Sequence, residues 1–131
     1  MPDTTDGERI RSLVHRYFDL HSRRDWSGLL DMFAPDVTLT HPVYPKSAGR
    51  DAVGRFFTEY IPSRFLKYFE YAPNVIVEKN QAAAEWVFEV TRLDGQPATL
   101  IGVTVLGFDG ERIKSIKIFT DPAQLGAGRT E

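Results

Sequence analysis

Cysteine is absent from the 131-residue sequence. Disulfide bonds, thiolate nucleophiles and metal sites built on sulfur are therefore excluded, and a reducing compartment is compatible with this composition. No apolar run approaches the roughly 20 residues that cross a bilayer, and the first residues, MPDTTDGER, are polar. We therefore expect a cytoplasmic protein with no membrane-spanning segment.

Charge of either sign is also not in excess, because 16 basic and 18 acidic residues give a formal net charge of -2. These residues are scattered without runs, so the sequence predicts no surface for nucleic acid or for an anionic membrane. The histidines, His15, His21 and His41, have no metal-ligand spacing with one another or with acidic residues. We expect no metal and no other cofactor.

Hydrophobic residues make up 42% of the chain and aromatic residues 12%, which is typical of one globular domain, here expected over residues 1–131. Apolar residues recur at helical spacing over 10–21, behind a capping-box pattern at Thr5 and Glu8. A short second helix is predicted over 26–33 with Asp25 as its cap, and a third over 50–61, ended by Pro62.

The second half of the chain has the composition of β-strands. Strands are predicted over 65–78 with a break at Pro73, and over 82–92, 98–108 and 112–120. Asp94-Gly95 and Asp109-Gly110 are hairpin turn signals, while Gly102 and Gly107 are expected to form bulges that bend the strands. Residues 126–131 are expected to form a frayed tail.

A shorter strand is predicted over 37–41, where Val37, Leu39 and His41 share one face by alternation. Pro42 and Pro45 then stop the strand and force a loop, so His41 is expected at the rim of an interior cavity. The element order is α-α-β-α-β-β-β-β. It predicts an α+β fold in which three N-terminal helices pack in a curved, mainly antiparallel sheet with a conical interior.

Several segments resemble the nuclear transport factor 2-like superfamily, and within it the SnoaL-like polyketide cyclases and the ketosteroid isomerases. They are RYFDL, RDWSGLLDMFAPDV, GRDAVGRFF, FDGERIKSIKIF and TDPAQL. The resemblance covers nearly the whole chain and implies a conical, cystatin-like barrel. It implies no single reaction, because this fold hosts isomerases, cyclases, dehydratases, epoxide hydrolases and non-catalytic binders.

The resemblance also implies roles for particular residues. The tyrosine of the isomerase site falls on Tyr17, as a hydrogen-bond donor, and the catalytic carboxylate falls on His41 of His41-Pro42-Val43. The protonated aspartate of its oxyanion hole falls near Thr104. His41 is then expected to act as the base in its neutral form, with Asp121 or His21 as the alternative base.

The remaining expected pocket residues come from helix stripes, from inward strand faces and from the loop after the first strand. Tyr44 is expected as a lid contact over the cavity mouth. The expected substrate-binding residues are His21, Tyr44, Phe57, Trp86, Phe88, Leu106 and Ile116.

Together these features predict a cofactor-independent enzyme, an isomerase, cyclase or dehydratase, that transfers a proton α to a carbonyl of a small hydrophobic molecule. The alternative is a non-catalytic ligand-binding or dimerisation module of the same fold. We also expect a homodimer through the outer sheet face, because Val87, Val103 and Val105 would otherwise form an exposed apolar patch.

Overall fold

The computed structural model describes residues 2–124, so the tail expected at 126–131 lies outside the described residues. No helix in this part of the chain is long and apolar enough to cross a membrane. The helical elements are α1 (Pro2–Ser22), α2 (Trp26–Asp31), α3 (Arg50–Arg55), the π-helical turn η1 (Phe56–Tyr60) and α4 (Ile61–Arg64). The strands are β1 (Phe33–Thr40), β2 (Ser47–Ala48), β3 (Phe65–Glu78), β4 (Gln81–Arg92), β5 (Pro97–Asp109) and β6 (Arg112–Thr120).

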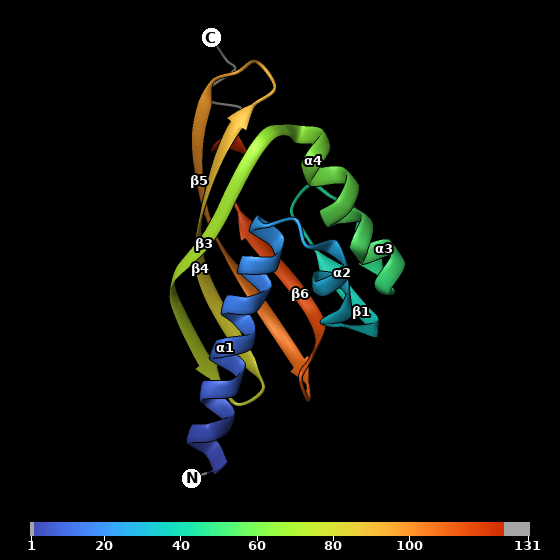
Figure 1. Ribbon diagram of the computed structural model, residues 1–131, viewed down its shortest axis with the longest axis vertical. Helices are drawn as coiled ribbons and strands as arrows, with labels where there is room; N and C mark the ends of the chain where they lie inside the picture. Colours follow the sequence, from blue (N-terminus) through green and yellow to red (C-terminus); the bar gives the residue numbers. More distant parts are fainter. Residues whose placement is uncertain (1, 125–131) are drawn as a thin grey trace.

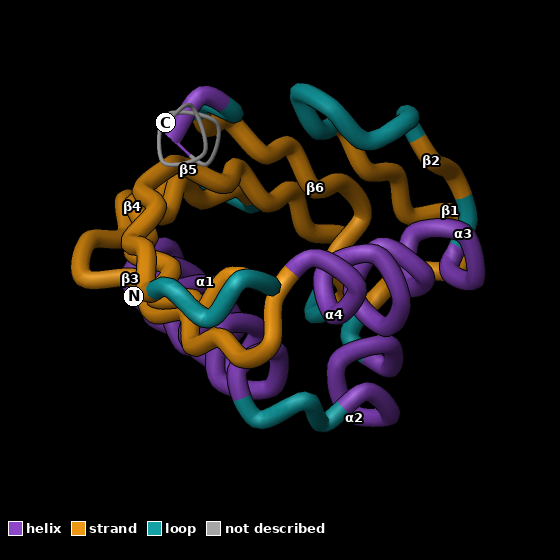
Figure 2. The backbone as a smooth tube through the Cα atoms, turned by 90° about the horizontal axis from the view of Figure 1, so that it is seen from above, coloured by secondary structure: helices purple, strands orange, loops and turns teal. Residues whose placement is uncertain are grey.

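The strands form one sheet in the order β2-β1-β6-β5-β4-β3. Strands β3 to β6 are an antiparallel meander, and β1 joins β6 in parallel. Figure 1 shows α1 lying across the sheet, and Figure 2 shows the sheet curving around the helices without closing. The expected α+β fold is confirmed, while the two-residue strand β2 was not predicted.

Helix α1 begins at Pro2, earlier than the cap expected at Thr5. Its apolar stripe is buried as predicted, since Val14, Tyr17 and His21 are almost wholly inaccessible. Two hydrogen bonds hold this helix on β3: Arg11 Nη1 donates to the carbonyl of Val75 at 2.6 Å, and Ser22 Oγ donates to that of Glu70 at 2.6 Å. The polar groups of α1 therefore keep its apolar face on the sheet.

The second helix ends at Asp31, not at 33, because Phe33 already pairs with Ile113 of β6. The third helix also differs from the prediction. Pro62 lies in the first turn of α4, which follows η1 without a break, so it does not end the helical segment. The π-helical turn before it adds a residue to the turn and changes which side chains face the sheet.

Two of the three expected strand irregularities occur. The register of β3 shifts between Tyr71 and Asn74, around Pro73, and that of β5 shifts at Gly107. The bulge expected at Gly102 was wrong, because its pairing with Trp86 and Thr120 is regular. A Cβ at Gly102 would lie 2.3 Å from the indole of Trp86, so this glycine makes room for that ring.

Candidate active site

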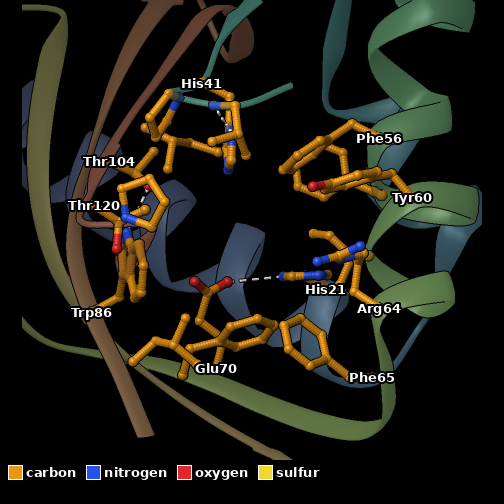
Figure 3. A pocket seen from close by; sticks show the side chains of 18 of the residues that line it. His21, His41, Phe56, Tyr60, Arg64, Phe65, Glu70, Trp86, Thr104 and Thr120 are labelled. Atoms are coloured by element: carbon orange, nitrogen blue, oxygen red, sulfur yellow. Dashed lines mark hydrogen bonds and ion pairs between the residues drawn. The ribbon is translucent and has the colours of Figure 1, made fainter. Parts of the chain in front are cut away.

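A cavity of about 350 Å³ lies between the inner face of the sheet and the helices. Its size is within the range of small-molecule sites, and its wall is mainly apolar, with many aromatic side chains. Figure 3 shows side chains from the helical region and from the sheet converging on it. The lining residues are Tyr17, His21, His41, Pro42, Val43, Phe56, Phe57, Tyr60, Ile61, Arg64, Phe65, Glu70, Trp86, Phe88, Leu100, Thr104, Ile118, Thr120, Asp121 and Pro122.

The pocket brings together most of the residues that the sequence predicted for a site. They are Tyr17, His21, His41, Phe57, Trp86, Phe88, Thr104 and Asp121. Strand alternation accounts for Trp86 and Phe88, which are buried on the inner face of β4. Because Tyr17 lies in the buried stripe of α1, helix periodicity accounts for its position in the same way.

Three of the expected substrate-binding residues, Tyr44, Leu106 and Ile116, lie outside the lining. Leu106 pairs with Ile116, one step beyond the pocket-lining pair of Thr104 and Ile118, and both are fully buried in the core there. Tyr44 packs against Phe56 and Tyr60, with ring centroids 5.0 and 4.8 Å away, and supports the wall from behind.

Glu70 is the most important residue that the sequence analysis missed. Figure 3 shows its carboxylate pointing into the pocket, between Trp86 and His21. Its Oε1 lies 2.9 Å from Nδ1 of His21, and the two side chains are only 10% and 2% exposed. With Glu70 ionised, the Nδ1–H of His21 donates to Oε1. Among the described side chains, residues 7–124, the other oxygen, Oε2, has no protein partner.

The position of Glu70 is held by the end of α1. Ser22 accepts the backbone N–H of Glu70 at 2.8 Å and donates to its carbonyl, so His21 and Ser22 together hold this point of β3. The His21 ring lies among Phe57, Tyr68 and Phe88, at centroid distances of 5.3, 5.5 and 6.1 Å. Its Nε2 is buried without a partner among the described residues. The ring therefore orients the carboxylate from within an apolar wall.

His41 lies at the opposite side of the pocket, just after β1 (Figure 3). Its Nδ1 accepts the backbone N–H groups of Val43 and Tyr44, each at 3.1 Å. A nitrogen that accepts two N–H groups carries no proton, so the neutral ring has its proton on Nε2. Burial lowers the pKa of His41 and favours this neutral form. His41 therefore presents an N–H donor.

Tyr17 and Thr104 add hydroxyl groups to the pocket. Burial raises the pKa of Tyr17 well above its ordinary value, and the nearby charge of Glu70 raises it further. The phenol therefore keeps its proton and remains a donor. The indole N–H of Trp86 donates to Thr104 Oγ1 at 2.8 Å, which orients the hydroxyl and leaves its proton free to donate.

Asp121 lies at the exposed rim, after β6. Its Oδ1 accepts the backbone N–H of Ala123 at 2.9 Å, a turn contact. Within the described ranges, no group of three or more His, Cys, Asp or Glu side chains is arranged to hold a metal ion.

Phe56, Tyr60 and Arg64 are further lining residues that the sequence analysis missed, because their positions depend on the unpredicted π-helical turn.

Comparisons with known proteins agree with this architecture. An NTF2-like protein of unknown function from Burkholderia pseudomallei is 25% identical, with a TM-score of 0.84 over 94% of this chain and 98% of that one. A putative polyketide cyclase from Xanthomonas campestris is 21% identical, with a TM-score of 0.79 over 93% and 97%. A putative ketosteroid isomerase from Kribbella flavida is 24% identical, with a TM-score of 0.75 over 90% and 82%.

A sequence search among curated proteins finds no match. The family model of the SnoaL-like domain matches residues 14–116. This range contains α2, β1 to β5 and residues 14–22 of α1, together with Tyr17, His21, His41, Glu70 and Thr104. The chain therefore belongs to the SnoaL-like domain family.

Proposed function

We propose that this protein is a cofactor-independent enzyme that transfers a proton α to the carbonyl group of a small hydrophobic molecule, with Glu70 as the base. The proposal rests on one observation above all. A carboxylate that is only 10% exposed faces an aromatic pocket and is oriented by a buried histidine. Such a group is poorly hydrated and fixed in direction, which suits a general base.

In this mechanism Oε2 of Glu70 removes a proton from the α carbon, and the electrons of that C–H bond move into the carbonyl to form an enolate. The Nε2–H of His41 and the hydroxyl of Tyr17 donate to the enolate oxygen, with Thr104 in support. Where a double bond of the substrate is conjugated with the enolate, return of the proton to the far carbon of the dienolate gives isomerisation. Attack of the enolate on a second carbonyl gives cyclisation, and loss of a β-hydroxyl as water gives dehydration.

The proposal gives His41 a different role from the base expected from the sequence. The Nδ1 lone pair of His41 is used by Val43 and Tyr44, and its Nε2 carries a proton in the neutral ring, so the neutral ring has no free site for another proton. The Nε2–H of the neutral ring can, however, donate a hydrogen bond to the enolate oxygen. The base role therefore passes to the pair of Glu70 and His21, of which His21 was an expected alternative.

A non-catalytic binding module of the same fold is the second candidate. It is favoured by the clamp between Ser22 and the backbone of Glu70, because a strand held there for structural reasons would also place the carboxylate beside His21. The two candidates differ in what Glu70 contributes. A structural pair affects the stability of the fold, whereas a catalytic pair affects the rate of proton removal.

Exchange of α protons tests the proposal without knowledge of the natural product. 1-Tetralone, 4-chromanone and androst-5-ene-3,17-dione would be incubated in D2O and the loss of α-proton signals followed by NMR. We expect the wild-type protein to accelerate exchange of at least one ketone, and Glu70→Gln to lower that rate about 10²- to 10⁴-fold. Glu78→Gln, on the same strand and exposed, is the matched control. Rates no faster than in buffer with all three proteins would favour the binding module, and equal acceleration by all three would rule out Glu70 as the base.

A further inference from the structure

Arg64 is the last residue of α4, and its exposed side chain lines the pocket. Among the described lining residues it is the only lysine or arginine. Figure 3 shows its guanidinium directed toward the space that Glu70 and His41 also face. Its Cζ lies over the ring of Tyr60, 5.9 Å from the centroid, so an aromatic face holds the cation at the pocket mouth.

This cation has no anionic partner among the described side chains, residues 7–124, and its guanidinium has no hydrogen bond there. Some other arginines are engaged by the protein itself. Arg11 and Arg50 donate to backbone carbonyls, and Arg92 pairs with Asp94 at 3.2 Å. Arg64 is exposed, as is Arg55, which also has no partner among the described side chains, but unlike Arg55 it borders an apolar cavity large enough for a ligand.

The two carboxylates of the pocket, Glu70 and Asp121, form no ion pair with Arg64. Oε1 of Glu70 takes the hydrogen bond of His21, and Oδ1 of Asp121 takes that of the Ala123 amide. The donors of Arg64 are therefore left for a ligand. A guanidinium offers two parallel N–H groups that match the two oxygens of a carboxylate, and the aromatic wall weakens the screening by water.

We propose that Arg64 forms an anion subsite at the mouth of the pocket, which binds a carboxylate carried by the hydrophobic ligand. Taken with the proposed function, on which this part rests, the substrate class is a hydrophobic carbonyl compound that also bears a carboxylate. The carboxylate is held at the rim by Arg64, and the carbonyl lies deeper, between Glu70 and the donors His41 and Tyr17. The subsite thus fixes which end of the molecule enters first.

Two probes of nearly equal shape test the subsite directly. 2-Naphthoate carries a carboxylate and 2-naphthamide a neutral amide on the same apolar body, and binding of each would be measured by calorimetry at pH 7.5. We expect wild-type protein to bind the naphthoate about tenfold more tightly, as hydrogen bonds to a charged group would give. Arg64→Gln should abolish this preference. Arg55→Gln, an exposed arginine outside the pocket lining, should retain it.

The outcomes separate this inference from the proposed function. Glu70→Gln should lose ketone exchange but keep the naphthoate preference, because the subsite does not need the base. A preference that depends on Arg64 in a protein without exchange activity would support the subsite and refute the enzyme. Equal binding of the two probes by wild-type protein, binding of neither, or a preference unchanged in Arg64→Gln would overturn the subsite. Circular dichroism would check that each variant is folded.

Discussion

Nδ1 of His21 lies 2.9 Å from Oε1 of Glu70, although the two residues are 49 positions apart in the sequence. The pair joins the end of α1 to β3 at the wall of the pocket. A carboxylate in such surroundings loses hydration, and its hydrogen bond to the imidazole compensates for part of that cost. The same contact therefore affects both the stability of the fold and the direction of the carboxylate.

Removal of the imidazole should destabilise the protein. His21→Leu leaves the carboxylate of Glu70 without its partner, and breaking a buried pair in this way costs about 3 kcal/mol. Glu70→Gln should cost less, because an amide oxygen can still accept the Nδ1–H of His21. Urea unfolding of both variants would measure the two costs. A loss in His21→Leu no larger than in Glu70→Gln would contradict the pairing.

His41 should make the stability depend on pH in a defined direction. Burial lowers its pKa below the ordinary value of 6.5 in the folded chain, so the unfolded chain binds more protons in the interval between the two values. The stabilising contribution of neutral His41 is therefore complete above pH about 6.5 and is lost as the pH falls toward the lower, folded value.

His41→Asn is the matched variant, because its amide oxygen can accept the same backbone N–H groups but does not titrate near neutrality. Free energies of unfolding would be measured for both proteins at pH 7.5 and pH 5.5. The stability of wild-type protein relative to His41→Asn should fall on acidification. A difference that stays constant or grows would show that His41 is not held in its neutral form.

The buried contact between Trp86 and Thr104 gives a third prediction. Thr104→Val removes the oxygen that accepts the indole N–H at 2.8 Å and leaves that donor unpaired in the core, which costs about 1 to 3 kcal/mol. In a Trp86→Phe background the donor is already absent, so the same substitution should cost less. Chemical unfolding of the wild-type protein, the two single variants and the double variant would give this double-mutant cycle. If Thr104→Val lowers the free energy of unfolding equally in both backgrounds, the hydrogen bond is not the cause of the loss.

Much of the fold could be predicted because its elements have clear periodicity. Alternation placed Trp86 and Phe88 on the inner face of β4, and helical spacing placed Tyr17 and His21 in the buried stripe of α1. Phe33 was assigned to the wrong element, because helical spacing continues through it although its backbone pairs with Ile113. Local pattern identifies a buried side chain more reliably than the point at which a helix becomes a strand.

Glu70 could not be assigned to the pocket by the same reasoning. Its neighbours Tyr68, Phe69 and Tyr71 are aromatic on both faces of β3, so alternation there does not distinguish inside from outside. The one indication in the sequence was that Glu70 comes two residues after Tyr68, so the two side chains lie on the same face of the strand. Its partner is in another element, and that contact depends on how α1 crosses the sheet. Arg64 was missed for a related reason, because the π-helical turn changes the phase of the helix that carries it.

We propose a homodimer formed through the outer sheet face, with a second copy of this chain as the partner. Val87, Val103 and Val105 are half-buried in the single chain, but neighbouring Ile101 and Phe119 are 61% and 56% exposed. Strand pairing puts Val87 beside Ile101 and Val103 beside Phe119, so the apolar surface is continuous across β4, β5 and β6.

Sedimentation velocity at micromolar concentration would test the dimer. Wild-type protein should sediment as a dimer, and Ile101→Lys should shift it toward monomer, because a charge would be buried in the interface. Leu93→Lys changes a residue of equal exposure, 59%, in the turn after β4, and should leave the dimer intact. A wild-type monomer would refute this interface.

Chemical rescue of proton exchange tests most directly whether Glu70 is the base. Glu70→Ala would be assayed on an exchanging ketone with and without added formate, beside His41→Ala with and without added imidazole. Our account predicts that formate, a carboxylate small enough for the vacated space, restores part of the exchange lost in Glu70→Ala, with circular dichroism confirming the fold. If formate restores nothing while imidazole restores exchange in His41→Ala, then His41 is the base and the assignment to Glu70 is wrong.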